Sequence, residues 1–197
     1  MIRRSRGVFA GALSLALLTA CATSPPPPAM AAKAREQVTD FTLNGRFALQ
    51  LTRADGSVEK AAGRLEWQHD SRRAYDRVQL ATPLGSGLAQ LQFRPGSAQL
   101  TTSDRRQIGG TDPVALLQEA TGFPLPVMQL PDWLLGRPGT HETLTRDPQQ
   151  RPQRLDSPPW RIDYRYPDAH PDSLPQRLDI SHPEIGLRLF VEEWQTP

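Results

Sequence analysis

The sequence has a single cysteine among its 197 residues, Cys21, which excludes an internal disulfide and any metal site built from several cysteines. It also lacks a large charge excess, because 23 Lys and Arg against 21 Asp and Glu give a formal net charge of +2. Three of the arginines (Arg3, Arg4 and Arg6) precede an apolar stretch, and subtracting their charges from +2 leaves −1 on the rest. A basic nucleic-acid-binding domain is therefore excluded.

Long hydrophobic runs are missing as well. The longest, Val8 to Leu18, is too short for a transmembrane helix, which needs roughly 20 apolar residues. Behind three arginines, a run of this length is typical of an export signal. Proline is abundant, at 20 residues, roughly twice the usual ~5%. This abundance argues against long helices and favours strands, turns and an extended linker.

The end of the apolar run, Leu18-Thr19-Ala20-Cys21, resembles the lipobox of bacterial lipoproteins. The resemblance implies that residues 1–20 are removed and that Cys21 receives a diacylglycerol and a third acyl chain. An ordinary secreted protein is the alternative, because Ala20-Cys21-Ala22 also fits a small-x-small cleavage pattern. By the same resemblance, the absence of aspartate directly after Cys21 points to the outer membrane. Each buried methylene contributes about 0.8 kcal/mol, so two or three acyl chains anchor a protein in effect permanently.

Residues 21–37 form a proline-rich segment that includes Pro25-Pro26-Pro27-Pro28. Such a composition cannot build a core, and polyproline II rises about 3.1 Å per residue. Whether extended or simply disordered, the segment acts as a tether. We therefore expect a signal peptide over 1–20, a lipidated tether over 21–37 and a folded domain over 38–197.

Period-2 alternation of apolar and polar residues dominates the rest of the chain and predicts β-strands. The alternating segments are separated by short turns, so we expect an antiparallel sheet. The expected strands are 41–51, 61–68, 78–80, 89–93, 98–100, 160–166, 178–180 and 187–191.

The middle of the chain changes to helical periodicity. Asp112-Pro113 is a typical helix start, with Asp as N-cap and Pro at the first helical position, and Gly122 ends the helix. A second short helix is expected over 127–135. The fold class is thus mainly β with inserted helices. Two short helices cover little of so large a sheet, so the interior is either a packed core or a sheet curled around partly unfilled apolar space; the pattern favours neither.

Several short motifs, in this order and spacing behind a lipobox, resemble the LolB family of outer-membrane lipoprotein receptors. The resemblance covers Phe41 to Trp194 and is poorest over 140–157. The motifs are Asn44-Gly45-Arg46-Phe47, Leu65-Glu66-Trp67-Gln68, Pro83-Leu84-Gly85, Pro95-Gly96, Thr121-Gly122-Phe123-Pro124-Leu125-Pro126, Trp133-Leu134-Leu135-Gly136-Arg137-Pro138-Gly139, and the tryptophans Trp160 and Trp194.

The resemblance implies an antiparallel half-barrel of the LolA/LolB type, closed by short helices around an apolar cavity. Its implied function is to accept acylated lipoproteins from the periplasmic carrier LolA and insert them into the inner leaflet of the outer membrane. The implied state is a monomer, lipid-anchored and facing the periplasm. Three acyl chains in water cost tens of kcal/mol at ~0.8 kcal/mol per methylene, so a lipoprotein needs apolar pockets on its way across the periplasm.

Two sets of residues are expected to carry this function. Ten apolar side chains are expected to line the acyl cavity, with a packed core as the alternative for each: Phe47, Leu49, Leu65, Trp67, Leu80, Leu91, Phe93, Leu117, Met128 and Trp133. Leu84 lies in a loop bounded by Pro83 and Gly85-Ser86-Gly87. It either folds back into the core or, as the resemblance implies, projects into solvent and helps insert clients into the membrane.

Two alternative functions are an anchored hydrolase and a structural or cell-wall-binding lipoprotein. In an anchored hydrolase, catalytic residues should cluster, but His69, His141, His170 and His182 are scattered and Gly85-Ser86-Gly87 is not a G-x-S-x-G elbow. A structural or cell-wall-binding lipoprotein would have a filled core and no acyl ligand. We expect no enzyme activity, no cofactor, no metal site and no nucleic-acid partner.

Overall fold

The computed structural model describes residues 35–121 and 125–197. The expected signal peptide, the lipidation site Cys21 and most of the expected tether lie outside the described residues. Ala32–Pro197 forms one compact unit, whose core side chains lie between Val38 and Val191. A short 3₁₀ helix, η1 (Arg35–Gln37), precedes the first strand.

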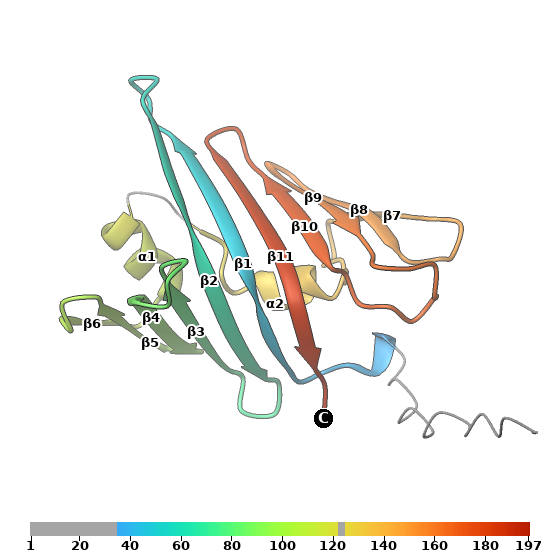
Figure 1. Cartoon of the computed structure of the whole chain (residues 1–197), viewed down its shortest axis with the longest axis horizontal. Helices are drawn as coiled ribbons and strands as arrows, with labels where there is room; N and C mark the ends of the chain where they lie inside the picture. Colours follow the sequence, from blue (N-terminus) through green and yellow to red (C-terminus); the bar gives the residue numbers. More distant parts are fainter. Residues whose placement is uncertain (1–34, 122–124) are drawn as a thin grey trace, which may run out of the picture. The chain divides into compact units, whose positions relative to one another are not determined.

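The described residues form one antiparallel sheet of eleven strands, in the order β6-β5-β4-β3-β2-β1-β11-β10-β9-β8-β7 (Figure 1). The strands are β1 (Phe41–Thr52), β2 (Val58–Asp70), β3 (Tyr75–Ala81), β4 (Gly87–Arg94), β5 (Ser97–Thr102), β6 (Gln107–Gly110), β7 (Thr143–Arg146), β8 (Pro152–Ser157), β9 (Trp160–Arg165), β10 (Arg177–Ser181) and β11 (Ile185–Gln195). The expected mainly-β class and antiparallel pairing are confirmed.

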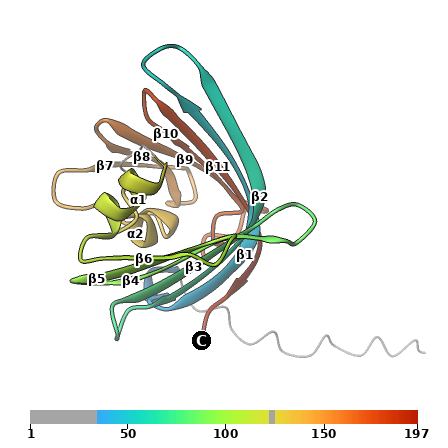
Figure 2. The same ribbon diagram turned by 90° about the vertical axis from the view of Figure 1, so that its left-hand side faces the viewer.

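The chain order places the helices between the two edges of this open sheet. The first strand pairs with the last in the middle of the sheet, so β6 and β7 become opposite edges. The segment that joins these edges contains α1 (Pro113–Thr121) and α2 (Leu130–Leu134). Figure 2 shows the sheet curving around both helices, which lie on its concave side.

Two glycines permit unusually close approach between neighbouring strands. A Cβ atom on Gly63 would lie 2.0 Å from the carbonyl oxygen of Ala81, and one on Gly45 would lie 2.4 Å from that of Phe190. Since real Cβ atoms do not approach oxygen so closely, any side chain at either position would push two strands apart. The close spacing of β2 to β3 at Gly63 and of β1 to β11 at Gly45 therefore requires glycine at both positions.

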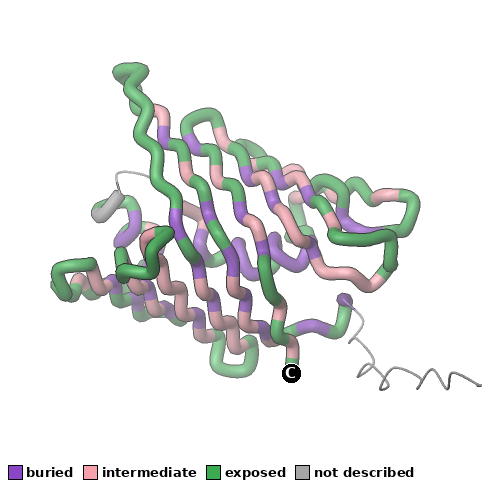
Figure 3. Tube along the Cα trace, in the orientation of Figure 1, coloured by how far each residue is buried: buried purple, intermediate pink, exposed green. Residues whose placement is uncertain are grey.

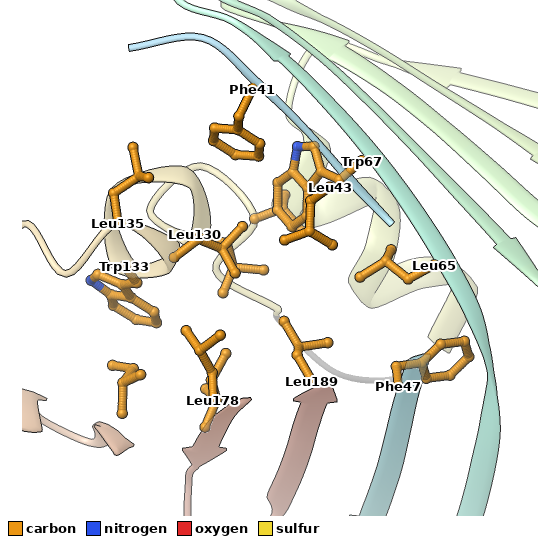
Figure 4. Close-up of a cluster of buried hydrophobic side chains, with 14 of the residues drawn as sticks. Phe41, Leu43, Phe47, Leu65, Trp67, Leu130, Trp133, Leu135, Leu178 and Leu189 are labelled. Atoms are coloured by element: carbon orange, nitrogen blue, oxygen red, sulfur yellow. The ribbon is translucent and has the colours of Figure 1, made fainter. Parts of the chain in front are cut away.

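Along the central strands, buried residues alternate with half-buried or exposed ones (Figure 3). Side chains of α2 meet the concave side, and Figure 4 shows Leu130 and Trp133 together with Leu178 and Leu189 of the sheet. Complete burial of one such side chain contributes about 1.5–3 kcal/mol. The helices are therefore held to the sheet mainly by apolar contacts.

The expected helices are present, with different lengths. Asp112 caps α1 as expected, because its Oδ1 accepts the Val114 N–H at 2.8 Å. The second helix is shorter than expected, since residues 127–129 form a turn before α2 begins at Leu130. The strands β6, β7 and β8 were not expected. The two edge strands, β6 and β7, each contribute only one large apolar side chain to the core, Ile108 and Leu144, so they carry no visible alternation.

Candidate functional site

The concave side of the sheet contains an apolar pocket of about 320 Å³, called here the concave-face pocket. Among the described residues that line it, Thr102 alone is polar. The strands β1 to β5 and β11 contribute the floor, while α1, α2 and the segment between them contribute the cover. The lining residues are Phe47, Leu49, Leu65, Trp67, Val78, Leu80, Ala89, Leu91, Leu100, Thr102, Leu117, Leu125, Val127, Leu130, Leu187 and Leu189.

The floor is built from rows of direct cross-strand partners. One row runs Leu65, Leu80, Ala89 and Thr102 across β2 to β5. The next runs Trp67, Val78, Leu91 and Leu100 across the same strands. Because partners in register lie on the same face of a sheet, four short alternating segments combine into one apolar surface.

The structure brings seven of the ten expected cavity residues together around this pocket: Phe47, Leu49, Leu65, Trp67, Leu80, Leu91 and Leu117. Their role in binding acyl chains stays a prediction. Eight further lining residues besides Thr102 were not named from the sequence. Most of them belonged to the expected strands, and continuing each cross-strand row would have found them once the register was known.

Three expected cavity residues lie elsewhere. Phe93 is buried one row beyond the floor, opposite Asp76 and Ala98. Trp133 is buried where α2 covers the other half of the sheet, next to Trp160 with ring centroids 6.1 Å apart. Met128 is 42% exposed, because residues 127–129 form a turn in which Val127, and not Met128, faces the pocket.

Buried hydrogen bonds fix the orientation of Trp67 in the pocket wall. Its indole Nε1 donates to Asp76 Oδ1 at 2.7 Å, and His69 Nδ1 lies 2.8 Å from the same oxygen. Phe41 stacks on the His69 ring at a centroid distance of 5.2 Å. Buried polar groups that are paired in this way hold one arrangement, so the indole presents a fixed apolar face to the pocket.

Polar contacts also fix α2, which covers the pocket through Leu130. Trp133 Nε1 donates to Glu142 Oε1 at 3.0 Å, and the Tyr164 hydroxyl donates to the Trp133 carbonyl at 2.7 Å. Burial alone would raise the pKa of Glu142, but hydrogen bonds from the Gly139 amide, Ser157 and Trp133 lower it overall. Burial raises the pKa of Tyr164 far above its usual range. Glu142 is thus a charged acceptor and Tyr164 a neutral donor.

Leu84 lies at the tip of a tight turn between β3 and β4 and is 96% exposed. The Gly85 amide donates to the Thr82 carbonyl at 2.9 Å, and the Thr82 amide donates to the Ser86 carbonyl at 2.7 Å. Gly85 has φ +92°, which an L side chain rarely adopts. This turn points Leu84 away from the core, and of the two alternatives for this residue the structure has the projecting one.

The same hydrogen-bond pattern occurs in three other turns, over residues 53–57, 102–106 and 147–151. In each, the fourth residue has positive φ, as Gly85 does. The third residue is Asp55, Asp104 or Gln149 in those turns and Leu84 in this one. Because this turn geometry is made elsewhere with a polar third residue, turn formation does not explain the leucine.

In the described part of the chain, no three His, Cys, Asp or Glu residues are placed to hold a metal ion. Among the same residues, no helix is both long and apolar enough to cross a membrane.

Comparison with known proteins gives a consistent result. Residues 39–194 match the family model described as "Outer membrane lipoprotein LolB". A protein of Dechloromonas aromatica named outer-membrane lipoprotein LolB is 42% identical over 191 residues, covering 96% of this chain and 98% of its own length. Proteins of the same name from Azoarcus sp. (37% identical; 91% of this chain, 90% of theirs) and Yersinia enterocolitica (30%; 92% of each) also match.

Among solved structures, a LolA superfamily protein from Nitrosomonas europaea has a TM-score of 0.46 and 12% identity, covering 83% of this chain and 90% of its own.

Proposed function

This chain belongs to the LolB family of outer-membrane lipoproteins. From this we propose that the concave-face pocket and the turn that carries Leu84 perform two successive steps of a lipoprotein receptor. It is a localisation factor at the outer membrane and not an enzyme. The concave-face pocket receives acyl chains of a client lipoprotein from the carrier LolA. The turn that carries Leu84 then promotes insertion of the client into the inner leaflet.

The observation that carries the first part is the lining of the concave-face pocket, whose described residues are apolar apart from Thr102. A pocket of about 320 Å³ lies at the lower end of the ~300–1,000 Å³ typical of small-molecule sites. Transfer of a client from carrier to receptor to membrane requires a gradient of affinity between apolar sites, because an acyl chain released into water at any stage would lose its apolar burial.

The second part is supported by the exposure of Leu84. An exposed leucine on a lipid-anchored domain lies within reach of the bilayer, and burying its side chain in the acyl region contributes about 1.5–3 kcal/mol. That contribution brings the receptor surface to the bilayer at the moment when the client must leave it. The predicted acylation of Cys21 keeps the domain at the membrane throughout.

A binding experiment with the Ala32–Pro197 unit tests the acyl-chain proposal. We expect this unit to be monomeric and to bind an acylated lipoprotein but not the same lipoprotein without its acyl chains. We expect Ala89→Phe to weaken binding of the acylated form at least about tenfold, because the larger ring fills part of the pocket. Ala48→Phe, on the exposed face of β1, is the matched control and should bind as the unchanged protein does.

Isothermal titration or a pull-down measures both forms, and circular dichroism checks that the two variants remain folded. Equal binding of acylated and unacylated clients would contradict the proposal and would favour a structural lipoprotein that binds protein surfaces only.

A further inference from the structure

A second hollow lies on the opposite side of the sheet, beside the turn that carries Leu84. This convex-face hollow has a volume of about 550 Å³. Gly85 and Gly87 form one side of it, and apolar residues such as Ala81 and Leu88 form part of the rest. Its polar side chains come from the strands, notably Arg64, Glu66, Gln79 and Gln90. These side chains alternate with the floor of the concave-face pocket, so they face away from the helices. Figure 2 shows the turn between β3 and β4 extending from this convex side.

The charges around the hollow leave one cation and one anion available. Arg46 and Glu192 pair with each other, with Nε and Oε1 2.7 Å apart. Arg64 lies directly opposite Arg46 in the register. Its exposed side chain forms no ion pair or hydrogen bond with any other described residue. Glu66 accepts one hydrogen bond, from Gln68 Nε2 at 3.1 Å, and has no cationic partner among the described residues.

Arg64 and Glu66 are two positions apart on one face of β2, which corresponds to about 6.6 Å along the strand. The hollow therefore presents a guanidinium and a carboxylate side by side. A ligand that carries one negative and one positive group a few bonds apart complements both. A purely anionic ligand would bring a negative charge towards Glu66 without compensation.

The position of this charge pair relative to Leu84 indicates the source of such a ligand. Arg64 pairs in register with Ala81, and the Cα atoms of Ala81 and Leu84, three residues apart, lie at most about 11 Å from each other. Arg64 is therefore beside the strand end that leads into the Leu84 turn. Apolar faces of peripheral proteins enter the boundary between headgroups and acyl chains by roughly 5–10 Å. With Leu84 at that depth, the strand ends beside the turn, and with them the convex-face hollow, come close to the phospholipid headgroups.

We propose that the convex-face hollow binds the headgroup of a zwitterionic phospholipid with a primary ammonium, that is, a phosphoethanolamine headgroup. Arg64 donates hydrogen bonds to the phosphate, for which the planar guanidinium is well shaped. Glu66 accepts from the ammonium. This inference rests on the proposed membrane role of Leu84 and adds to it a preference for the lipid at which insertion occurs.

Sedimentation with vesicles at millimolar lipid tests the proposal, using the Ala32–Pro197 unit so that no anchor contributes. The vesicles are phosphatidylcholine alone, or phosphatidylcholine mixed with phosphatidylethanolamine or with phosphatidylglycerol. We expect the strongest binding with phosphatidylethanolamine and the weakest with phosphatidylglycerol. Arg64→Gln should weaken binding to the phosphatidylethanolamine vesicles about fivefold, and Glu66→Gln should abolish the preference for ethanolamine over choline.

Arg94→Gln is the matched control, because Arg94 is exposed and lies at the end of β4 away from the Leu84 turn. It should bind as the unchanged protein does. Strongest binding to phosphatidylglycerol, with equal losses in Arg64→Gln and Arg94→Gln, would overturn the proposal in favour of general attraction to anionic lipid. An unchanged ethanolamine preference in both hollow variants would overturn it as well.

Vesicle binding by Leu84→Glu distinguishes a failure of the proposed membrane role of the turn from a failure of the headgroup site. If Leu84→Glu binds every vesicle as the unchanged protein does, the membrane role of the turn is wrong. If Leu84→Glu loses binding while Arg64→Gln and Glu66→Gln retain both affinity and preference, the turn acts as proposed and the headgroup site does not exist.

Discussion

Leu84→Glu should separate acceptance of a client from its delivery to the membrane. Leu84 is 96% exposed and contributes almost no core contact, so the free energy of unfolding should change by less than about 1 kcal/mol. The concave-face pocket lies on the other side of the sheet from this turn, so acceptance of a client from LolA should be unchanged. The effect is expected only where the tip must enter lipid.

The expected loss of delivery follows from two contributions. Removing the leucine forfeits about 1.5–3 kcal/mol of apolar burial. A carboxylate entering the acyl region adds a cost that is at most about 3 kcal/mol at the bilayer centre and smaller near the headgroups. Together they come to about 1.5 to 6 kcal/mol, which predicts a loss between roughly tenfold and ~20,000-fold at 1.4 kcal/mol per factor of ten. Client should therefore accumulate on the receptor.

Three measurements test whether Leu84→Glu loses delivery alone: thermal melting, transfer of client from carrier to receptor, and transfer of client from receptor to liposomes. Gln149→Glu is the matched control, since it introduces the same charge at the same position of a turn with the same hydrogen bonds. A Leu84→Glu protein that unfolds would show that the side chain is part of the core. Normal delivery by Leu84→Glu would refute the insertion role.

Three further outcomes are expected. Cys21→Ser should be exported as a soluble periplasmic protein without acylation, and palmitate label retained by the variant would contradict the lipobox interpretation. Gly63→Val should lower the free energy of unfolding by more than about 2 kcal/mol, because its Cβ would lie 2.0 Å from the Ala81 oxygen. Chemical denaturation measures this loss. Gly87→Val is the control, because the space around Gly87 is open. Burial alone would raise the pKa of Asp147, but its bonds to Arg151 lower it overall. The pair therefore stabilises the fold above pH about 4 and loses this contribution as the pH falls through the lowered pKa. The melting difference from Asp147→Asn should vanish at low pH, and a constant difference would contradict this.

Local features of this chain could be predicted from sequence because their causes are local. The cap of α1 by Asp112 follows from the geometry of a helix N-terminus. The turn at Leu84 follows from Pro83 and Gly85, which favour its backbone conformation whatever surrounds them. The central strands follow from the alternation of apolar and polar residues with period two, which is visible within a few consecutive residues.

The arrangement of the site was decided by tertiary structure. Leu65, Leu80 and Ala89 come from three strands, and only the register makes them one row of the pocket floor. The edges β6 and β7 carry little apolar alternation and are strands because a neighbouring strand supplies their hydrogen bonds.

Met128 and Trp133 also show that sequence alone does not fix the lining of the pocket, since both were expected there and neither lines it. The turn before α2 exposes Met128, and packing against Trp160 takes Trp133 to the other half of the sheet. A sequence records which side chains avoid water. Which of them share one cavity depends on how distant segments pack, because burial is nondirectional and any apolar neighbour satisfies it equally.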